Sequence, residues 1–241
     1  MAKIVAIHSC EDESQLKASD LWESVVPAQF PGQYPLLKVY GAGNPANGQL
    51  RATRATSNLH DLLVDPEVLL MIGLAHGEEF VFPGYRETLY DSKVRLPSGQ
   101  TDEIVGKIVH LLVCDTARSL QAPDQSIGQA FYKQGGCRAF IGYTGSPDFD
   151  ASWLRSIIDC DAQIDLLLAQ GKSVAEAVEG AKALYERRAQ AAPANEAQSL
   201  RALAACLTCV PGSGVDFSKV YLVPGAVRIY EVKSRGGLDL P

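Results

Sequence analysis

The chain has 241 residues, of which 46% are hydrophobic and 21% charged, a composition typical of a folded globular protein and not of a disordered one. Lysine and arginine number 22 against 28 aspartates and glutamates, and the net charge of -6 offers no basic surface for a phosphate backbone, so we expect no nucleic-acid partner. No window approaches the ~18 consecutive apolar residues of a membrane span, so we expect no membrane partner either.

The first residues, MAKIVAIHSCEDES, match neither a signal peptide nor a transit peptide, which predicts a cytoplasmic protein. The chain contains six cysteines, an ordinary use of a small apolar residue at this length. We therefore expect free thiols and no disulfide framework.

The first half of the chain alternates short apolar runs with helical segments. The runs at residues 3–8, 35–40 and 68–75 predict buried parallel strands, because they are continuously apolar and end in turn residues. Helices are predicted between them, over 13–26 and 57–64. Three short runs within residues 80–96, separated by Pro83-Gly84 and Asp91-Ser92, predict a small antiparallel insertion, and a short helix is predicted over 101–107.

The second half continues the alternation. Strands are predicted over 108–113 and 138–143, with a helix over 126–134 between them. Three helices then follow, over 152–170, 173–190 and 196–209, and two final strands, 219–223 and 227–232, are predicted to pair around Pro224-Gly225. This order predicts one α/β domain over residues 1–241: a mostly parallel sheet with helices on both faces, a small antiparallel insertion, and C-terminal helices plus a hairpin.

Two chemically reactive side chains directly follow predicted strands. His76-Gly77 comes after the run VLLMIGLA, and Cys114 comes after IVHLLV. Ligands bind at the carboxyl ends of strands in open α/β sheets, and consecutive strands are usually neighbours, so we expect the imidazole and the thiol to share one crevice. A thiol beside an imidazole can attack a carbonyl carbon, with the backbone N–H groups of Gly77 and Cys114 as oxyanion donors.

The segments MIGLAHG, KIVHLLVCDTARS and IGQAFYKQGGCRAFIGYTGSP resemble the caspase-like (clan CD) cysteine peptidases, and more closely their bacterial CHAT-domain branch. The stretch DLLLAQGKSVAEAVEGAKAL resembles the helix pair that follows the last core strand of CHAT domains. The resemblance implies a thiol protease that hydrolyses peptide bonds through a thioester, with Cys114 as nucleophile, His76 as general acid and base, and Gly77 as the oxyanion glycine. It implies no metal and no organic cofactor, and as partners a protein or peptide substrate and a possible regulatory protein.

The caspase signature Q-A-C-[RQG]-G is absent, so specificity for aspartate is not implied. Acidic residues follow several predicted strands, and Asp12, Asp115 and Asp148 are the candidates for a pocket that binds Arg or Lys before the scissile bond. The alternative is that these acids are simply solvated.

Two other classes of function stay open at this stage. One is a catalytically silent caspase-like domain that binds a partner protein. The other is a small-molecule or nucleotide-binding α/β protein that uses Gly41-x-Gly43, although Ala46 replaces the third glycine of that fingerprint. His8, His60 and His110 are interpreted as structural, and Cys206-x-x-Cys209 as packing rather than a metal or redox site, because no second ligand pair accompanies it.

Overall fold

The computed structural model describes residues 3–10, 13–26, 29, 37–41, 63–77, 81–84, 87–91, 102–121, 124–146, 152–211, 214–222 and 228–235. Within this part of the chain no helix is long and apolar enough to cross a membrane.

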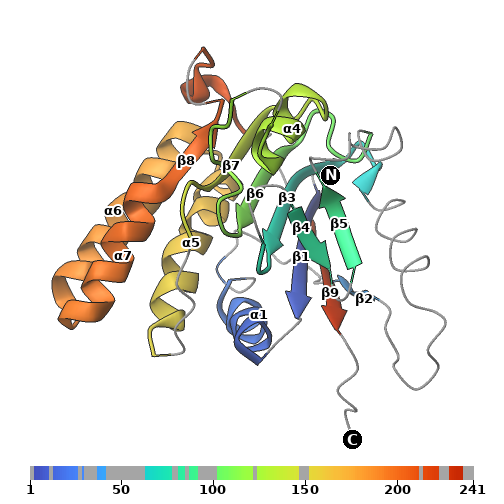
Figure 1. The fold of residues 1–241 in the computed structure, drawn as a ribbon. Coiled ribbons are helices and arrows are strands. Elements are labelled where there is room, and N and C mark those ends of the chain that lie inside the picture. The colour runs from blue at the N-terminus through green and yellow to red at the C-terminus, as the bar shows by residue number, and fades with distance from the viewer. Residues whose placement is uncertain are drawn as a thin grey trace, which may run out of the picture.

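A seven-stranded sheet forms the centre of the molecule (Figure 1). Its strands, in chain order, are β1 (Lys3–Cys10), β2 (Leu37–Gly41), β3 (Val68–Leu74), β6 (Ile108–Leu112), β7 (Ala139–Tyr143), β8 (Leu207–Val210) and β9 (Arg228–Arg235). In space their order is β2-β9-β1-β3-β6-β7-β8, and every neighbouring pair is parallel except β7 and β8. A separate antiparallel pair consists of β4 (Val81–Gly84) and β5 (Glu87–Asp91). The predicted mostly parallel sheet and the small antiparallel insertion are confirmed.

Side chains along the central strands alternate between two buried clusters, as the pleat requires. In β1, Ile4 and Ala6 belong to one cluster, and Val5 and Ile7 to the other. The helices that pack into the first cluster are α1 (Glu13–Val25), α5 (Leu154–Ala169), α6 (Val174–Ala191) and α7 (Ala194–Cys206). The second cluster packs against α4 (Ile127–Lys133). Helices therefore cover both faces, which explains why the strands read as continuous apolar runs.

Two of these helices begin where the sequence predicts. Ser126 caps α4 and Ser173 caps α6, and each serine side chain accepts a hydrogen bond from the backbone N–H three residues later. In both cases the side chain at that third position, Gln129 or Glu176, reaches back to the cap, which completes a capping box.

The predicted C-terminal hairpin is wrong. Phe217–Lys219 forms a short 3₁₀ turn (η3), and Tyr221 makes an isolated antiparallel bridge with Ser173. Strand β9 instead lies parallel between β2 and β1. An apolar strand sequence does not specify its partner, and the edge of β1 that faces away from β3 offers a whole row of backbone groups for β9 to pair with.

Two helix predictions also need correction. The predicted helix over 196–209 ends at Cys206, because residues 207–210 form β8 and pair with β7. Residues 102–106 form turns rather than a helix. Of the predicted helix over 57–64, only Leu63 and Val64 lie within the described residues.

Candidate active site

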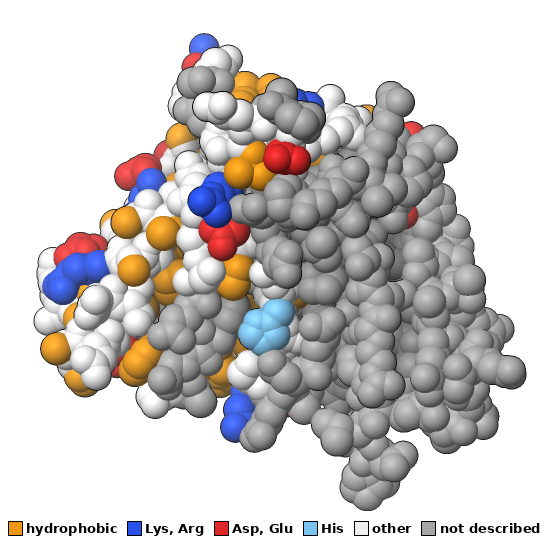
Figure 2. All heavy atoms as spheres, in the orientation of Figure 1, with side chains coloured by type: hydrophobic (Ala, Val, Ile, Leu, Met, Phe, Trp, Pro, Cys, Tyr) orange, Lys and Arg blue, Asp and Glu red, His pale blue; other side chains and the backbone are white. Residues whose placement is uncertain are grey.

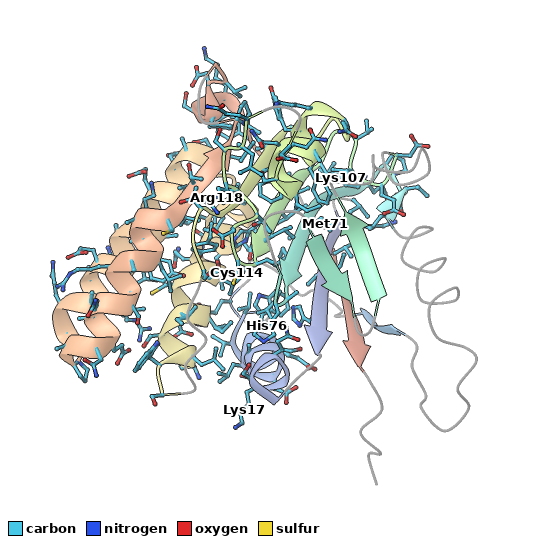
Figure 3. The ribbon with its side chains drawn as sticks, viewed as in Figure 1. Lys17, Met71, His76, Lys107, Cys114 and Arg118 are labelled. Carbon is cyan, nitrogen blue, oxygen red and sulfur yellow. The ribbon has the colours of Figure 1, made fainter. Side chains whose placement is uncertain are left out.

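Strands β3 and β6 bring His76 and Cys114 to the same end of the sheet. The strands are parallel neighbours, and their last paired residues are Leu74 and Leu112. One residue beyond this pair, the N–H of Ala75 donates to the carbonyl of Leu112 at 3.5 Å, so the pairing of the two strands continues for one more residue. His76 and Cys114 each lie two residues beyond that last pair, on strands about 4.8 Å apart. The expected juxtaposition of the two loops is therefore supported by the register of the sheet, and Figure 3 shows both residues beyond the strand ends.

His76 and Cys114 are both partly exposed. Figure 2 shows a histidine at the molecular surface. Because His8 and His110 have no exposed surface, and His60 lies outside the described residues, this histidine is His76. Its imidazole is therefore accessible to a substrate that approaches the end of the sheet, and Gly77 follows it directly.

The chain turns sharply after Cys114. Asp115 adopts a φ of 54°, in the left-handed region that aspartate tolerates better than most residues. Its N–H donates to the carbonyl of Gly145 at 3.1 Å, and its own carbonyl accepts from the N–H of Arg118 at 3.1 Å. Farther along, the Thr116 carbonyl accepts from the N–H of Gly128 in α4 at 2.8 Å. Hydrogen bonds to two other segments thus fix the turn that carries the thiol.

Four influences act on the Cys114 thiol. Burial, the largest, raises its pKa, and the nearby charge of Asp115 raises it as well. A hydrogen bond from the Ser146 side chain and one from the backbone of Cys114 lower it, and the net shift is upward. The thiol is therefore mostly protonated at neutral pH, and a reaction through the thiolate requires a base to remove the proton.

Ser146 connects these groups, although no motif in the sequence singles it out. Its hydroxyl donates to Oδ2 of Asp115 at 3.2 Å and also interacts with the Cys114 thiol. The residue lies just after β7, three positions beyond Tyr143, in the polar stretch TGSP. The only available signal was that β7 neighbours β6, so the residues after β7 reach the same end of the sheet as Cys114.

Of the three aspartates predicted for a substrate pocket, Asp115 lies beside the nucleophile. Asp12 and Asp148 lie outside the described residues.

A cavity of about 340 Å³ is present on the α4 side of the turn. The residues that line it are Ala117, Ser119, Gln129, Tyr132, Lys133, Thr144, Thr208, Cys209, Val210 and Pro211. They include neither His76 nor Cys114, and none of them is acidic. The described residues that line this cavity therefore offer no carboxylate to an arginine or lysine side chain.

A buried polar network, not foreseen in the sequence, connects the sheet to α5 and α6. His110 of β6 has no exposed surface, and its two ring nitrogens face Asp165 Oδ1 at 2.9 Å and Asp161 Oδ1 at 3.2 Å. The Tyr143 hydroxyl donates to the same Asp161 oxygen at 2.6 Å and lies 3.0 Å from the Tyr185 hydroxyl. His110 has a structural role, as predicted. It fills this role as a charged group that pairs with carboxylates, rather than as an apolar side chain.

The charges of this network follow from its geometry. Burial on its own opposes a charged imidazole, but the carboxylates of Asp161 and Asp165 outweigh this effect and raise the pKa of His110 to about 10. Burial also raises the pKa of Asp165 above its ordinary value, although His110 counteracts it. The signal in the sequence was the spacing of the two aspartates by four residues in α5, because such a pair shares one helix face.

The other candidate side chains behave as packing elements. His8 is fully buried, its Nδ1 lies 2.9 Å from the Ser19 hydroxyl, and its ring meets Trp22 edge-on. Burial raises the pKa of Cys209 to about 12, so this thiol stays neutral. Among the described residues, no group of three His, Cys, Asp or Glu side chains is arranged to hold a metal ion.

Comparisons with known proteins provide little additional information. No protein-family model matches the sequence, and no curated protein matches it. Among solved structures, the fold is similar to the complex of Porphyromonas gingivalis RgpB pro- and mature domains, with a TM-score of 0.44 and 12% sequence identity over 84% of this chain. This match covers 53% of the other chain, so the present chain spans about half the length of the structure it matches. The likeness is therefore weak.

Proposed function

We propose that this protein is a cysteine endopeptidase of the caspase-like type, with Cys114 as nucleophile and His76 as general acid and base. The observation that supports this proposal is the register of β3 and β6, which brings the two residues to equivalent positions past neighbouring strand ends. The sequence resemblance to caspase-like peptidases, on the segments around His76 and Cys114, points the same way.

The proposed reaction has two stages. His76 removes the thiol proton, and the Cys114 sulfur forms a bond to the peptide carbonyl carbon, whose oxygen takes up the negative charge near the N–H groups of Gly77 and Cys114. The carbon–nitrogen bond then breaks, the amine leaves with the proton from His76, and a thioester forms. His76 next takes a proton from water, which attacks the thioester and releases the acid and the free thiol. The raised pKa of Cys114 makes the base essential, since little thiolate is present without it.

Labelling with peptidyl acyloxymethyl ketones tests the dyad. We expect the wild-type protein to be modified at Cys114, the Cys114→Ala variant not at all, and the His76→Ala variant at least about 100-fold more slowly, the usual size of a general-base contribution. Both residues lie beyond strand ends, so both variants should keep the wild-type circular dichroism spectrum. Cys206→Ala, which removes another partly exposed thiol, is the matched control and should label normally. Labelling that persists in Cys114→Ala would refute the assignment.

We further propose that the enzyme cleaves after Arg or Lys, with Asp115, Asp12 or Asp148 as the acid that receives the basic side chain. The position of Asp115 beside the nucleophile supports this, because a carboxylate there can accept a guanidinium with two hydrogen bonds.

Three peptide substrates that differ only in Arg, Asp or Leu before the scissile bond test the specificity. We expect Arg to be preferred in kcat/KM, and the preference to fall by roughly 10-fold or more when the responsible aspartate becomes Asn, the loss of a charged hydrogen bond. Asp124→Asn, a change at an exposed acid in the segment before α4, is the control. A preference for Asp or Leu, or an Arg preference that survives all three aspartate changes, would contradict the proposal.

The second candidate is a catalytically silent caspase-like domain that binds a partner protein. The burial of Cys114 favours it, because burial raises the pKa of the thiol and so disfavours the reactive thiolate. The two candidates differ in whether His76 accelerates the labelling of Cys114. The five cysteines with described side chains are free thiols, which suits the reducing cytoplasm that we propose as the compartment.

A further inference from the structure

The hydroxyl of Ser146 has a single proton and two groups that compete for it. One is the carboxylate of Asp115, to which the hydroxyl donates in this structure at 3.2 Å. The other is the sulfur of Cys114, whose pKa a hydrogen bond from this hydroxyl lowers, because such a bond stabilises the thiolate. A hydroxyl that donates to Asp115 cannot donate to the sulfur at the same time.

The backbone holds the three groups in this arrangement. Asp115 is fixed by its left-handed φ of 54° and by the bond from its N–H to the Gly145 carbonyl, the residue before Ser146. That bond connects the turn after β6 to the segment after β7. It joins the backbone of Asp115 to the residue before Ser146, so it holds the carboxylate and the hydroxyl near each other.

We infer that Ser146 and Asp115 together form a switch that controls the nucleophile, in which an ionised Asp115 occupies the hydroxyl and repels the thiolate, and a neutralised Asp115 releases the hydroxyl to stabilise the thiolate. Ser146 acts through Cys114 and is a positioning residue. The inference rests on the proposed function for its purpose, since a basic substrate group at Asp115 would neutralise the carboxylate and activate the thiol only when substrate is bound.

Other titratable groups lie at the same end of the sheet and must be separated from Asp115. His76 comes from β3, Arg118 follows Asp115 in the same turn, and Lys17 lies on α1 beyond His76 in Figure 3. A double-mutant cycle with changes at Asp115 and Ser146 measures the coupling between these two residues. The neighbouring groups are the same in all four proteins of the cycle, so their effects cancel.

The test measures alkylation of Cys114 by iodoacetamide from pH 6 to 10, with the modified cysteine located by peptide mass spectrometry. This reaction needs no peptidase activity, so its outcome is independent of the proposed function. Asp115→Asn keeps the size of the side chain and tolerates the same backbone conformation. We expect it to increase the rate at pH 7 by up to roughly 10-fold, the effect of one pKa unit on the thiolate fraction.

When Ser146 is already changed to Ala, Asp115→Asn should give less than half of that gain in alkylation rate, because no hydroxyl remains to be released. Ser146→Thr, which keeps the hydroxyl, should restore the full gain, and Asp124→Asn should give none. The cycle is repeated in His76→Ala to separate the effect of Asp115 from that of the imidazole.

An Asp115→Asn protein that reacts no faster than wild type would overturn the inference, as would an equal gain with and without the Ser146 hydroxyl. If the predicted rates are found but no peptide is cleaved, the switch stands and the endopeptidase proposal fails.

Discussion

Gly128 determines how closely α4 approaches the turn that carries Cys114. A Cβ at this position would lie 2.8 Å from the Thr116 carbonyl and 2.6 Å from Cδ1 of Phe140. The Thr116 oxygen also accepts the hydrogen bond from the Gly128 N–H, so it cannot move away without breaking that bond. The absence of a side chain at Gly128 is therefore a condition for the shape of the candidate site.

Gly128→Ala should destabilise the protein by about 1–3 kcal/mol, because overpacking against backbone outweighs the gain of about 1 kcal/mol in helix propensity. It should also slow the labelling of Cys114, since Thr116 is two residues away. The matched control is Gly180→Ala in α6, whose Cβ would meet only the end of the Leu167 side chain closely, at 2.4 Å. That flexible side chain can move, so we expect a neutral or stabilising effect. Urea unfolding measures the stability of both variants. Equal losses of stability in Gly128→Ala and Gly180→Ala would contradict this explanation.

At the candidate site, the sequence was sufficient for residues that directly follow an apolar strand. The positions of His76, Gly77 and Cys114 past the strand ends could be predicted because the ends of the apolar runs fix the ends of β3 and β6. Ser146 and the conformation of Asp115 could not, because they depend on which strand lies beside β6 and on a hydrogen bond between two loops.

At the level of elements, His110 connects β6 to α5 through two buried carboxylates. Ion pairs of this kind contribute little net stability when intact, but removal of one partner leaves an unpaired buried charge and costs several kcal/mol. Asp161 and Asp165 lie on α5, whereas His110 and Tyr143 lie on β6 and β7. The polar network therefore specifies how α5 sits on these two strands.

The network predicts a decrease in stability at alkaline pH. The pKa of His110 is about 10 in the folded protein against 6.5 for an ordinary histidine, so between these values the folded protein keeps a proton that the unfolded chain releases. The stabilisation is complete below the lower value and declines as pH rises towards the upper one. The free energy of unfolding should therefore fall more steeply between pH 7 and 9.5 in the wild type than in His110→Gln.

Because His110→Gln leaves two carboxylates buried and can prevent folding, Tyr143→Phe is the second variant. It removes the hydroxyl that donates to Asp161 and keeps the ring, so it should cost about 1–3 kcal/mol and retain the wild-type dependence on pH. Urea titrations at each pH provide the data. A wild-type slope equal to that of His110→Gln would show that His110 carries no proton in this range.

For the whole molecule, the sequence predicted the fold class well and the strand partners poorly. The alternation of strands and helices, the helix starts at Ser126 and Ser173, and the β4–β5 insertion follow from local patterns that are visible in the chain. The placement of β9 between β1 and β2 does not, since residues 228–235 and β1 are far apart in the sequence and only the folded sheet brings them together. Pro224-Gly225 indicated a local turn, but the neighbouring residues form a long-range pair.

The position of β9 has a consequence for synthesis of the protein in the cell. Among the strands of the sheet, β1 is made first, but one of its two edges is covered only by β9, which is made last. Until then β1, whose residues 4–8 are fully buried in the finished fold, exposes an unpaired strand edge that another nascent chain can pair with. Efficient production of the protein should therefore depend on chaperones that shield this edge until the last strand is inserted.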